Sequence, residues 1–441
     1  MQTFFTPAQM TDPNIHDVNQ ILRTCVHCGF CNSTCPTYVL LGDELDSPRG
    51  RIYLIKDMFE HDKPASAKVT KHIDRCLSCL SCTTTCPSGV DYMHLIDQAR
   101  VRIEKTYRRP FFECMMRTLI MQVLPNPTLL RWSLIVAWIV KPLRFAFPKQ
   151  LKAMLGLTPR TLASPSPVDR PQVFPAIGEQ KKRVALLNGC AQQVLRPSIN
   201  EATISLLTRH GCEVIIADGV GCCGALVHHM GNEMAAQEQA RVNILAWKYL
   251  VADNNEDAEN EKIENMGGLD AIIVNASGCG TMMKDYGALF RDDYIFAERA
   301  GRIASLVCDI SEFVMDLDLK PSTLTEDFSV TYQSACSMQH GQRISTQPQA
   351  LLAQAGYSVR EPKEAHLCCG SAGTYNILQP ELAAQLRDRK AENIAATKPD
   401  LVVTGNIGCL MQLEESVGVP ILHTVELLDW ATGGAKPQGL E

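Results

Sequence analysis

Cys25-Val-His-Cys28-Gly-Phe-Cys31-Asn-Ser-Thr-Cys35-Pro36 is the stretch that decides the fold of the amino-terminal part of the chain. The same spacing, C-x2-C-x2-C-x3-C-P, returns at Cys76-Leu-Ser-Cys79-Leu-Ser-Cys82-Thr-Thr-Thr-Cys86-Pro87. In this pattern three closely spaced thiolates hold one iron–sulfur cubane, and the fourth cysteine reaches the other cluster. The two runs therefore predict two [4Fe–4S] clusters with crossed ligation.

The crossed pattern assigns four cysteines to each cluster. The ligands predicted for cluster 1 are Cys25, Cys28, Cys31 and Cys86. The ligands predicted for cluster 2 are Cys76, Cys79, Cys82 and Cys35. Because each cluster takes one ligand from the other segment, loss of a cluster should unfold this region. Zinc is the alternative for paired cysteines, but zinc sites close with four ligands, which a third cysteine at the same short step does not match.

Composition points to metal or redox chemistry rather than to disulfides. The 441 residues include 19 cysteines, and residues 1–10 lack the basic and apolar stretches of a secretory leader. The formal net charge of −6 gives no reason to expect nucleic-acid binding. No window reaches the roughly 18 apolar residues that a membrane-spanning helix needs. We therefore expect a cytoplasmic chain of two or three domains.

The carboxy-terminal half contains an internal repeat marked by cysteines. In each copy a single cysteine, a Cys-Cys-Gly triplet and another single cysteine follow in order, and the first two steps share an offset of 146 residues. Strands are predicted before these cysteines, at 184–188, 214–217, 272–275, 330–333 and 401–404. Helical patterns lie between them, so each copy is predicted to be an α/β unit with its cysteines on loops at strand ends.

The repeat offers four cysteines per copy as a possible metal site. The first quartet is Cys190, Cys222, Cys223 and Cys279, and the second quartet is Cys336, Cys368, Cys369 and Cys409. Adjacent cysteines on a turn can both face one metal, and glycine lets the backbone approach closely. A further iron–sulfur cluster, zinc, or buried thiols without metal are the alternatives that the sequence leaves open. Three cysteines without a counterpart in the repeat are expected to be buried thiols: Cys114, Cys212 and Cys308.

Two other motifs resemble functional sites but are predicted to be structural. Residues 219–224 match the dinucleotide fingerprint G-x-G-x-x-G, yet the second copy keeps only Cys-Cys-Gly and the acid about twenty residues on is missing. His423 and Glu426 have the spacing of one helical face. A proton-carrying role for His423 is possible, but we expect the pair to cap or orient a helix.

The fold class expected from these patterns is mixed, with four sections. Residues 1–110 are predicted to form a mainly α-helical ferredoxin-type domain with two [4Fe–4S] clusters, including a helix that begins at Ser47-Pro48. Residues 111–182 are predicted to form basic amphipathic helices and a stiff, proline-rich linker. The two Cys-Cys-Gly domains follow at 183–320 and 326–435. The acidic run at 253–264 is expected to be a surface insertion.

The basic section combines positive charge with aromatic and aliphatic residues. Between Arg100 and Lys152 there are eleven Lys or Arg and two Glu, interleaved with Trp132, Trp138 and many aliphatic residues. A basic amphipathic stretch with tryptophans can lie on an anionic membrane surface. Packing against a partner subunit or against the chain's own core is an equal alternative.

The double cysteine run joined to two Cys-Cys-Gly domains resembles the iron–sulfur subunits of bacterial glycolate oxidase (glycolate dehydrogenase). The resemblance spans essentially the whole chain. It is most specific in five stretches, which are 23–31, 34–38, 41–45, 47–53 and 86–89. The iron–sulfur subunits of lactate and anaerobic glycerol-3-phosphate dehydrogenases, and the heterodisulfide reductases, share the architecture.

The resemblance implies an electron-transfer subunit with no catalytic residue of its own and no activity alone. Flavin (FAD) dehydrogenase partner subunits would oxidise glycolate to glyoxylate. This chain would pass the electrons to a membrane acceptor, expected to be quinone, at the inner face of the cytoplasmic membrane. The alternatives are a subunit of a lactate or glycerol-3-phosphate dehydrogenase, or a heterodisulfide-reductase-like subunit that is catalytic at its Cys-Cys-Gly sites. Ala276 and Asn406 stand where heterodisulfide reductase has a fifth cysteine, so five-cysteine ligation is not expected.

Overall fold

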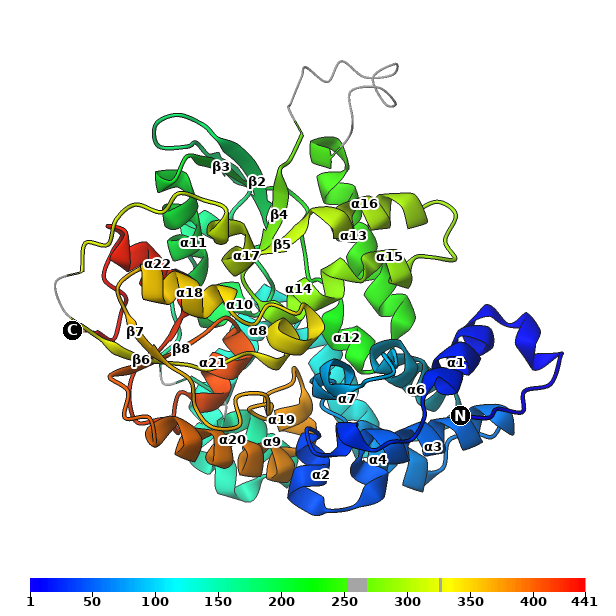
Figure 1. Cartoon of the computed structure of the whole chain (residues 1–441). Helices are drawn as coiled ribbons and strands as arrows, with labels where there is room; N and C mark the ends of the chain where they lie inside the picture. The colour runs from blue at the N-terminus through cyan, green and yellow to red at the C-terminus, as the bar shows by residue number, and fades with distance from the viewer. Residues whose placement is uncertain (157, 160, 252–267, 325–326, 441) are drawn as a thin grey trace, which may run out of the picture.

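The computed structural model describes residues 1–156, 158–159, 161–251, 268–324 and 327–440. Figure 1 shows a helical amino-terminal part, drawn in blue, beside two α/β units drawn in green and in yellow to red. This arrangement confirms the predicted fold class, with a ferredoxin-type region followed by two repeated units. The acidic run predicted to be an insertion, at 253–264, lies outside the described residues.

The amino-terminal part consists of short helices around the two cysteine runs. Their core is apolar and includes Val18, Leu22, Ile55 and Leu95, all fully buried. Helix α3 begins as predicted, because the Ser47 hydroxyl accepts a hydrogen bond from the Gly50 amide at 3.0 Å. The elements are η1 Gln9–Thr11, α1 Pro13–Thr24, η2 Phe30–Asn32, α2 Pro36–Leu41, η3 Glu44–Asp46, α3 Pro48–Glu60, α4 Ala67–Asp74, α5 Ser81–Thr85 and α6 Tyr92–Thr106.

The section that follows contains the predicted basic helices and one strand that the sequence did not predict. Strand β1 lies inside the proline-rich linker and pairs antiparallel with β3 of the first α/β unit. The linker is therefore partly an edge strand, because its proline-free residues 172–174 can form ladder hydrogen bonds. The elements are α7 Phe111–Val123, α8 Pro127–Val140, η4 Lys141–Ala146, α9 Lys149–Gly156, η5 Pro167–Asp169 and β1 Gln172–Phe174.

The first α/β unit is a five-stranded sheet with the order β1-β3-β2-β4-β5. All its neighbouring strands are parallel except the β1–β3 pair. Its strands after β1 are β2 Lys182–Leu186, β3 Cys212–Ile216, β4 Ala271–Val274 and β5 Val307–Asp309. Its helices are α10 Gln192–Leu195, α11 Ser198–Arg209, α12 Ala225–His229, α13 Glu233–Val251, α14 Ser277–Lys284, α15 Tyr286–Leu289, α16 Ala297–Leu306 and α17 Ile310–Met315.

The second α/β unit has the same strand order once β1 is set aside. Its four parallel strands run β7-β6-β8-β9, which matches β3-β2-β4-β5 position by position. The strands are β6 Ser329–Tyr332, β7 Ser358–Arg360, β8 Leu401–Thr404 and β9 Ile421–His423. The helical elements are η6 Ser337–Gly341, α18 Gln347–Gln354, α19 Tyr375–Leu378, α20 Pro380–Ala395, α21 Ile407–Leu413 and α22 Thr424–Ala431. The cysteine repeat therefore corresponds to a repeated topology.

The two units pack through helices, α11 against α22 and α17 against α18, around one shared core. Buried residues of both sheets belong to a single apolar cluster, including Val184 and Ile273 from the first unit and Val330 and Val403 from the second. The five predicted strands all form, within a few residues of the expected ends. Strands β5, β7 and β9 were not predicted, because each has only three residues and too short a pattern to read.

The last helix of each unit begins with the same kind of cap. Asp309 is the N-cap of α17 and forms a capping box with Glu312, and His423 is the N-cap of α22 and forms one with Glu426. The Glu426 carboxylate accepts from the His423 amide at 2.8 Å, and the His423 imidazole accepts from the Val425 amide at 3.2 Å. The expectation that His423 and Glu426 cap a helix is confirmed.

Candidate functional site

Five cysteines from two distant segments line one small cavity near the amino terminus, namely the four predicted for cluster 1 and Cys82. Burial, reinforced by the neighbouring Cys25 and Cys86, raises the pKa of the Cys31 thiol to about 11. Cys86 comes from the second run, 55 residues after Cys31, and is the member that the spacing assigned to this group. The cysteines of this group, called the cluster 1 group, are Cys25, Cys28, Cys31 and Cys86.

A second small cavity is lined by the four cysteines predicted for cluster 2, of which Cys82 also lines the first cavity. Burial raises the pKa of Cys82 well above that of a free thiol, and the nearby Cys79 and Cys76 add to the shift. Cys35, from the first run, lies in this cavity as the crossed pattern predicts. The cluster 2 group consists of Cys76, Cys79, Cys82 and Cys35. Both cavities fit a donor set of four sulfur atoms, which is what an iron–sulfur cubane takes.

The backbone turns the same way in both runs. Non-glycine residues with positive φ stand two residues after the first cysteine of each run, namely His27 at 55° and Ser78 at 50°. Two residues further on, Gly29 has φ of 82° and Leu80 of 60°. Left-handed backbone is costly for residues other than glycine, so these turns are held by the surrounding structure. They curl three cysteines of each run toward one point.

A buried guanidinium lies beside the cluster 2 group. Arg51 is 1% exposed and donates to the Cys35 sulfur at 3.7 Å and to the His72 carbonyl at 2.8 Å. Its charge faces the Asp46 carboxylate at 3.6 Å, which also pairs with His72 and Arg75. Sequence reasoning did not single out Arg51. The sequence feature that could have indicated its role is its place on the apolar face of α3, four residues before the buried Ile55.

Other polar groups complete the surroundings of the cluster 2 group. The Tyr92 hydroxyl donates to the Cys76 sulfur at 3.8 Å, and Arg100 donates to the Cys76 carbonyl at 2.8 Å. Hydrogen bonds and positive charge near thiolate sulfurs stabilise an anionic cluster and tune its potential. Both residues come from α6, which the sequence analysis did not connect with the cysteines.

The cysteines of the first repeat gather at the carboxyl ends of parallel strands. Cys190 follows β2, the Cys222-Cys223 pair follows β3, and Cys279 follows β4. The sulfurs of Cys190 and Cys222 are 3.6 Å apart. Carboxyl ends of parallel strands are the usual place for binding sites in open α/β sheets. The predicted first quartet is therefore brought together, although Cys279 lies in the first turn of α14 rather than on a loop.

The second quartet has the same placement in the second repeat. Cys336 follows β6, the Cys368-Cys369 pair follows β7, and Cys409 lies in the first turn of α21 after β8. The sulfurs of Cys336 and Cys368 are 3.6 Å apart, as in the first quartet. Four thiols in each copy thus form a donor set suited to iron or zinc.

A buried carboxylate connects the ferredoxin-type part with the first repeat. Asp97 of α6 lies 3.8 Å from the His228 imidazole and 4.0 Å from that of His229, both in α12. Burial opposes ionisation, but the two histidines and Arg100 outweigh it and lower the pKa of Asp97 to about 2. No sequence pattern indicates this contact, because its partners are more than a hundred residues apart.

The three cysteines outside the repeat differ in burial. Cys212 is fully buried in β3, as expected. Cys308 is only partly buried, and the expectation for Cys114 was wrong, because it is exposed. Cys114 lies on the outer side of α7, whose buried residues are Met116, Arg117 and Ile120.

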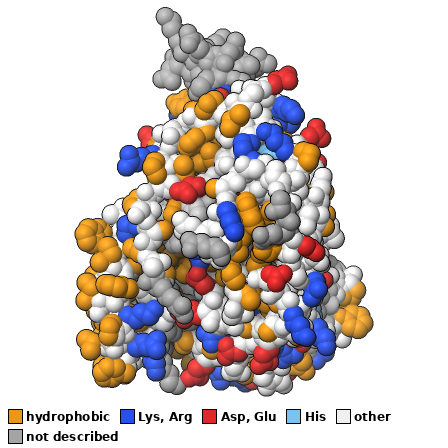
Figure 2. All heavy atoms as spheres, turned by 90° about the vertical axis from the view of Figure 1, so that its left-hand side faces the viewer, with side chains coloured by type: hydrophobic (Ala, Val, Ile, Leu, Met, Phe, Trp, Pro, Cys, Tyr) orange, Lys and Arg blue, Asp and Glu red, His pale blue; other side chains and the backbone are white. Residues whose placement is uncertain are grey.

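The basic section exposes a contiguous apolar surface. In α8 only Leu130 is buried, whereas Trp132 and Trp138 are each 63% exposed and Ile139 is 66% exposed. The exposed stripe continues into η4 with Leu143 and Phe145. Figure 2 shows hydrophobic side chains projecting along its lower left edge with basic side chains beside them, on the side at the back of Figure 1 where α8 is drawn. No helix in the described part of the chain is long and apolar enough to cross a membrane.

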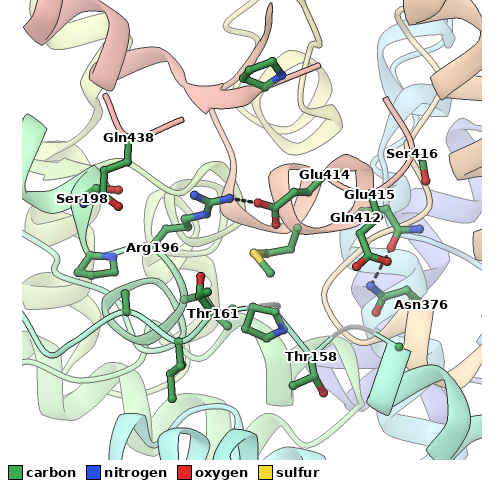
Figure 3. A pocket seen from close by; sticks show the side chains of 18 of the residues that line it. Thr158, Thr161, Arg196, Ser198, Asn376, Gln412, Glu414, Glu415, Ser416 and Gln438 are labelled. Atoms are coloured by element: carbon green, nitrogen blue, oxygen red, sulfur yellow. Dashed lines mark hydrogen bonds and ion pairs between the residues drawn. The ribbon is translucent and has the colours of Figure 1, made fainter. Parts of the chain in front are cut away.

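A large pocket lies away from these cysteines, between the linker and the repeats. Figure 3 shows Arg196 paired with Glu414, and Asn376 donating to Gln412 at 3.0 Å. None of the described residues that line it is a cysteine. Its mixed polar lining offers no metal donor set of the kind that the cysteine groups form.

Family models match the two parts of the chain separately. Residues 21–90 match the 4Fe-4S dicluster domain, and residues 184–284 and 330–414 match the cysteine-rich domain. These ranges contain both cysteine groups of the amino-terminal part and both quartets.

Similar proteins cover almost the full length. The chain is 37% identical to the glycolate oxidase iron-sulfur subunit of Escherichia coli over 98% of this chain and 99% of that protein. It is 33% identical to a probable glycolate oxidase iron-sulfur subunit of Bacillus subtilis over 93% and 94% of the two chains. Lactate utilization protein A of Bacillus licheniformis is 26% identical, over 56% of this chain and 99% of that protein.

A solved structure with a similar fold is a hypothetical protein from Helicobacter pylori. The match has a TM-score of 0.54 at 11% identity and covers 99% of this chain and 75% of that one. At this identity the likeness concerns the fold alone.

Proposed function

The chain belongs to the family of glycolate oxidase iron–sulfur subunits, and from this premise we propose that it relays electrons from a flavin-bearing partner subunit to a membrane acceptor. The observation that carries the proposal is the arrangement of eight cysteines into two groups of four, each with one member from the other segment. A [4Fe–4S] cluster held by each group would accept and release one electron at a time.

The cysteine spacing, together with the two cavities, supports a ligand assignment. We propose that Cys25, Cys28, Cys31 and Cys86 hold one cluster and that Cys76, Cys79, Cys82 and Cys35 hold the other. Arg51, Tyr92 and Arg100 support the second cluster by hydrogen bonds or charge near its ligands. These residues bind and tune a cofactor, so glycolate oxidation to glyoxylate is assigned to FAD-bearing partner subunits, and the chain alone should be inactive toward glycolate.

The α8 stripe supports a place on the inner face of the cytoplasmic membrane. Its exposed tryptophans and aliphatic side chains would enter the region of the lipid headgroups, and the exposed Arg144 would face anionic lipid phosphates. Arg131 and Lys141 instead donate to the carbonyls of Ala163 and Thr158. Quinone, as a membrane-dissolved acceptor, would then be within reach of a peripheral subunit. Both cysteine quartets are proposed as further metal sites, and each would hold an iron–sulfur cluster or zinc.

The central test is the iron content and electron paramagnetic resonance of the full chain purified without oxygen. Eight irons from the two amino-terminal groups per chain and two reducible cubane signals are expected, on the order of four irons per cluster. Reduction of the signals by glycolate should require the partner subunits. A colourless, iron-poor protein after reconstitution would contradict the proposal.

Membrane docking is tested by flotation with lipid vesicles. Full chain should bind vesicles that contain phosphatidylglycerol more strongly than vesicles of phosphatidylcholine alone, and less so at high salt. The double variant Trp132→Ala/Trp138→Ala should lose most of this binding. Tyr294→Ala, which removes another highly exposed aromatic side chain from the first repeat, is the matched control. Equal binding of both variants would contradict docking through α8.

A further inference from the structure

A carboxylate and two imidazoles converge where α6 of the ferredoxin-type part meets α12 of the first repeat. Asp97 lies within α6, and His228 and His229 are the last two residues of α12. One ligand atom from each of the three residues lies within 4.8 Å of the other two. None of the three belongs to a cysteine group or a quartet, so the proposed electron relay does not account for them.

The donor atoms at this junction are buried without the hydrogen bonds that usually accompany burial. Asp97 is 7% exposed, and its Oδ1 atom has no hydrogen-bond partner among the described residues. The buried Nδ1 atom of His229 likewise has none within the described part of the chain. The imidazoles of His228 and His229 lie 3.8 and 4.0 Å from the carboxylate oxygens, too far for hydrogen bonds. Since buried polar atoms are rarely left unpaired, these donors call for a partner from outside the chain.

Arg100 is the nearby cation, but its guanidinium is directed at other acceptors. Its Nη1 atom donates to the Ser78 hydroxyl at 2.6 Å, and its Nη2 atom donates to the Cys76 carbonyl at 2.8 Å. The guanidinium lies 3.7 Å from the Asp97 carboxylate, which is an ion pair without a hydrogen bond. Arg100 therefore offsets part of the negative charge but leaves the lone pairs of the carboxylate free.

Two imidazole nitrogens and one carboxylate oxygen are a suitable donor set for a divalent transition-metal ion. Zinc binds such atoms at about 2.0–2.2 Å, so the ligand atoms around one tetrahedral ion are roughly 3.3–3.6 Å apart. The separations of 3.8 and 4.0 Å exceed this spacing by less than about 1 Å, which small side-chain rotations can close. Burial also lowers the pKa of His229, and this favours the neutral imidazole that a metal ion binds.

The two helices are held firmly at this junction. Gly231, two residues after His229, has φ of 81°, and a Cβ added there would lie 2.7 Å from the Arg100 carbonyl oxygen. Arg117 of α7 donates to the Met230 carbonyl at 2.8 Å and pairs with Glu104 of α6 at 2.9 Å. Donor atoms on packed helices keep their relative positions better than donor atoms on loops do. The arrangement is therefore largely formed before an ion binds.

A pocket leads to the junction from the surface. Asp97 and His228 line it together with residues of α1, α13 and α15. Its charged lining residues are mostly acidic, including Asp17 and Glu233, so the pocket attracts cations. The pocket thus gives an ion a path to the three donors and leaves room for water at the remaining coordination positions.

The second repeat has no histidines at the equivalent positions. The 146-residue offset places Thr374 and Tyr375 where the first repeat has His228 and His229. A Cys-Cys-Gly unit therefore folds without them. The two histidines occur in the repeat that meets Asp97, which favours a role at this junction over a role in the fold of the repeat.

We propose that Asp97, His228 and His229 bind one divalent transition-metal ion, with water in its remaining coordination positions, and that this ion fastens the ferredoxin-type part to the first repeat. The site is separate from the eight cluster cysteines and from both quartets, and it does not depend on the proposed electron relay. Because the ligands come from two parts of the chain, the ion binds only where α6 and α12 are docked, and so it stabilises the docked arrangement.

X-ray absorption at the zinc edge tests the site in the full chain. Zn²⁺ is added to the anaerobically purified protein until binding saturates. Zinc at this site should show nitrogen and oxygen neighbours at about 2.0–2.2 Å, whereas zinc in a cysteine quartet shows sulfur at about 2.3 Å. Zinc with sulfur neighbours alone, or no bound zinc, would overturn the proposal and leave the two cubane signals of the relay unaffected.

Variants of the three ligands locate the bound zinc. Asp97→Asn and His229→Gln should each lose the zinc with nitrogen and oxygen neighbours while both cubane signals remain. His229→Gln decides where Asp97→Asn fails to fold, because the His229 side chain is 40% exposed. Zn²⁺ should also raise the unfolding temperature of the unchanged chain but not that of His229→Gln.

A histidine in the same pocket supplies the matched control. The ring nitrogens of His94 already contact the carboxylates of Asp91 and Asp285, at 2.5 and 3.0 Å. His94→Gln should therefore bind zinc and respond to it in thermal unfolding as the unchanged chain does. Equal zinc binding by His94→Gln and His229→Gln, whether retained or lost in both, would overturn the assignment of the ligands.

Discussion

The two Cys-Cys-Gly repeats share strand order, cysteine placement and capping boxes, yet they meet the ferredoxin-type part through different chemistry. The first repeat does so through polar pairs, with Asp97 near His228 and with His94 bound to Asp285. The second repeat does so through apolar packing of Leu77 and Cys79 on Cys368, together with a hydrogen bond between Thr84 and His340. The difference shows that duplication preserved the fold, while the neighbours of each copy determine what its cysteines can do.

Removal of iron is expected to have the largest effect, because it should expose the apolar contact of the second repeat and leave the first repeat covered. Because each cluster joins two segments, stripping iron with a chelator should unfold much of residues 1–110. The second quartet should then lose its cover, so that Cys368 is alkylated much faster. Cys223, inside its own core, should stay protected.

Mass spectrometry of alkylated peptides before and after iron removal measures this effect. Cys114, which is exposed already, serves as the internal standard for reagent activity. Equal acceleration at Cys368 and Cys223 would show that the two repeats depend on the clusters to the same degree.

The next largest effect is expected at Arg51, on the cluster 2 side of the apolar contact. Arg51→Met removes one partner of the buried pair with Asp46 and a donor to Cys35. The loss should destabilise the amino-terminal part by about 3–5 kcal/mol. Urea unfolding of the iron-loaded chain, followed by the visible absorption of the clusters, measures it.

A surface lysine supplies the control for Arg51. Lys63 pairs with Asp57, and both side chains are more than half exposed. Lys63→Met should therefore change stability by less than about 1 kcal/mol. A similar loss of stability in both variants would show that the buried Arg51–Asp46 pair contributes no more than an exposed pair.

A smaller effect is expected where the repeats are alike. The Asp309 carboxylate accepts from the Ser311 amide at 2.8 Å, and Asp309→Ala should cost about 0.5–2 kcal/mol through loss of the cap. His423→Ala should cost a similar amount in the second repeat. Asp309→Asn and His423→Asn keep a capping oxygen and should cost less. Thermal unfolding of the four variants measures these losses. A large difference in stability between the two alanine variants would contradict the equivalence of the two caps.

The smallest effect is expected from pH at the polar contact of the first repeat. The Asp285 and Asp91 carboxylates raise the pKa of His94 to about 10. Since the folded pKa is above the unfolded value of about 6.5, the contact stabilises fully below about pH 6.5 and is lost as pH rises toward about 10. At a partly exposed site we expect less than about 1 kcal/mol. Hydrogen exchange of α6 and α15 should increase over this range, and His94→Gln should remove the pH dependence.

The repeated spacing was enough to predict the local chemistry. Three cysteines at short steps followed by Cys-Pro can adopt few arrangements around a cubane, so the spacing predicts two groups of four cysteines, and the structure brings these cysteines to two small cavities. The 146-residue offset likewise predicted two α/β units, because it aligns strands as well as cysteines. The strands that escaped prediction are three residues long or lie in the linker.

The identity of each quartet's neighbours was decided by tertiary structure alone. Arg51 approaches Cys35 because a helix begins at Ser47. Cys79 meets Cys368 because the ferredoxin-type part packs on the second repeat. No spacing rule connects residues that meet only when helices dock, since docking depends on the shapes of whole faces. The sequence by itself therefore determined which cysteines can share a metal, and packing decided which charges and which neighbouring sulfurs those cysteines meet.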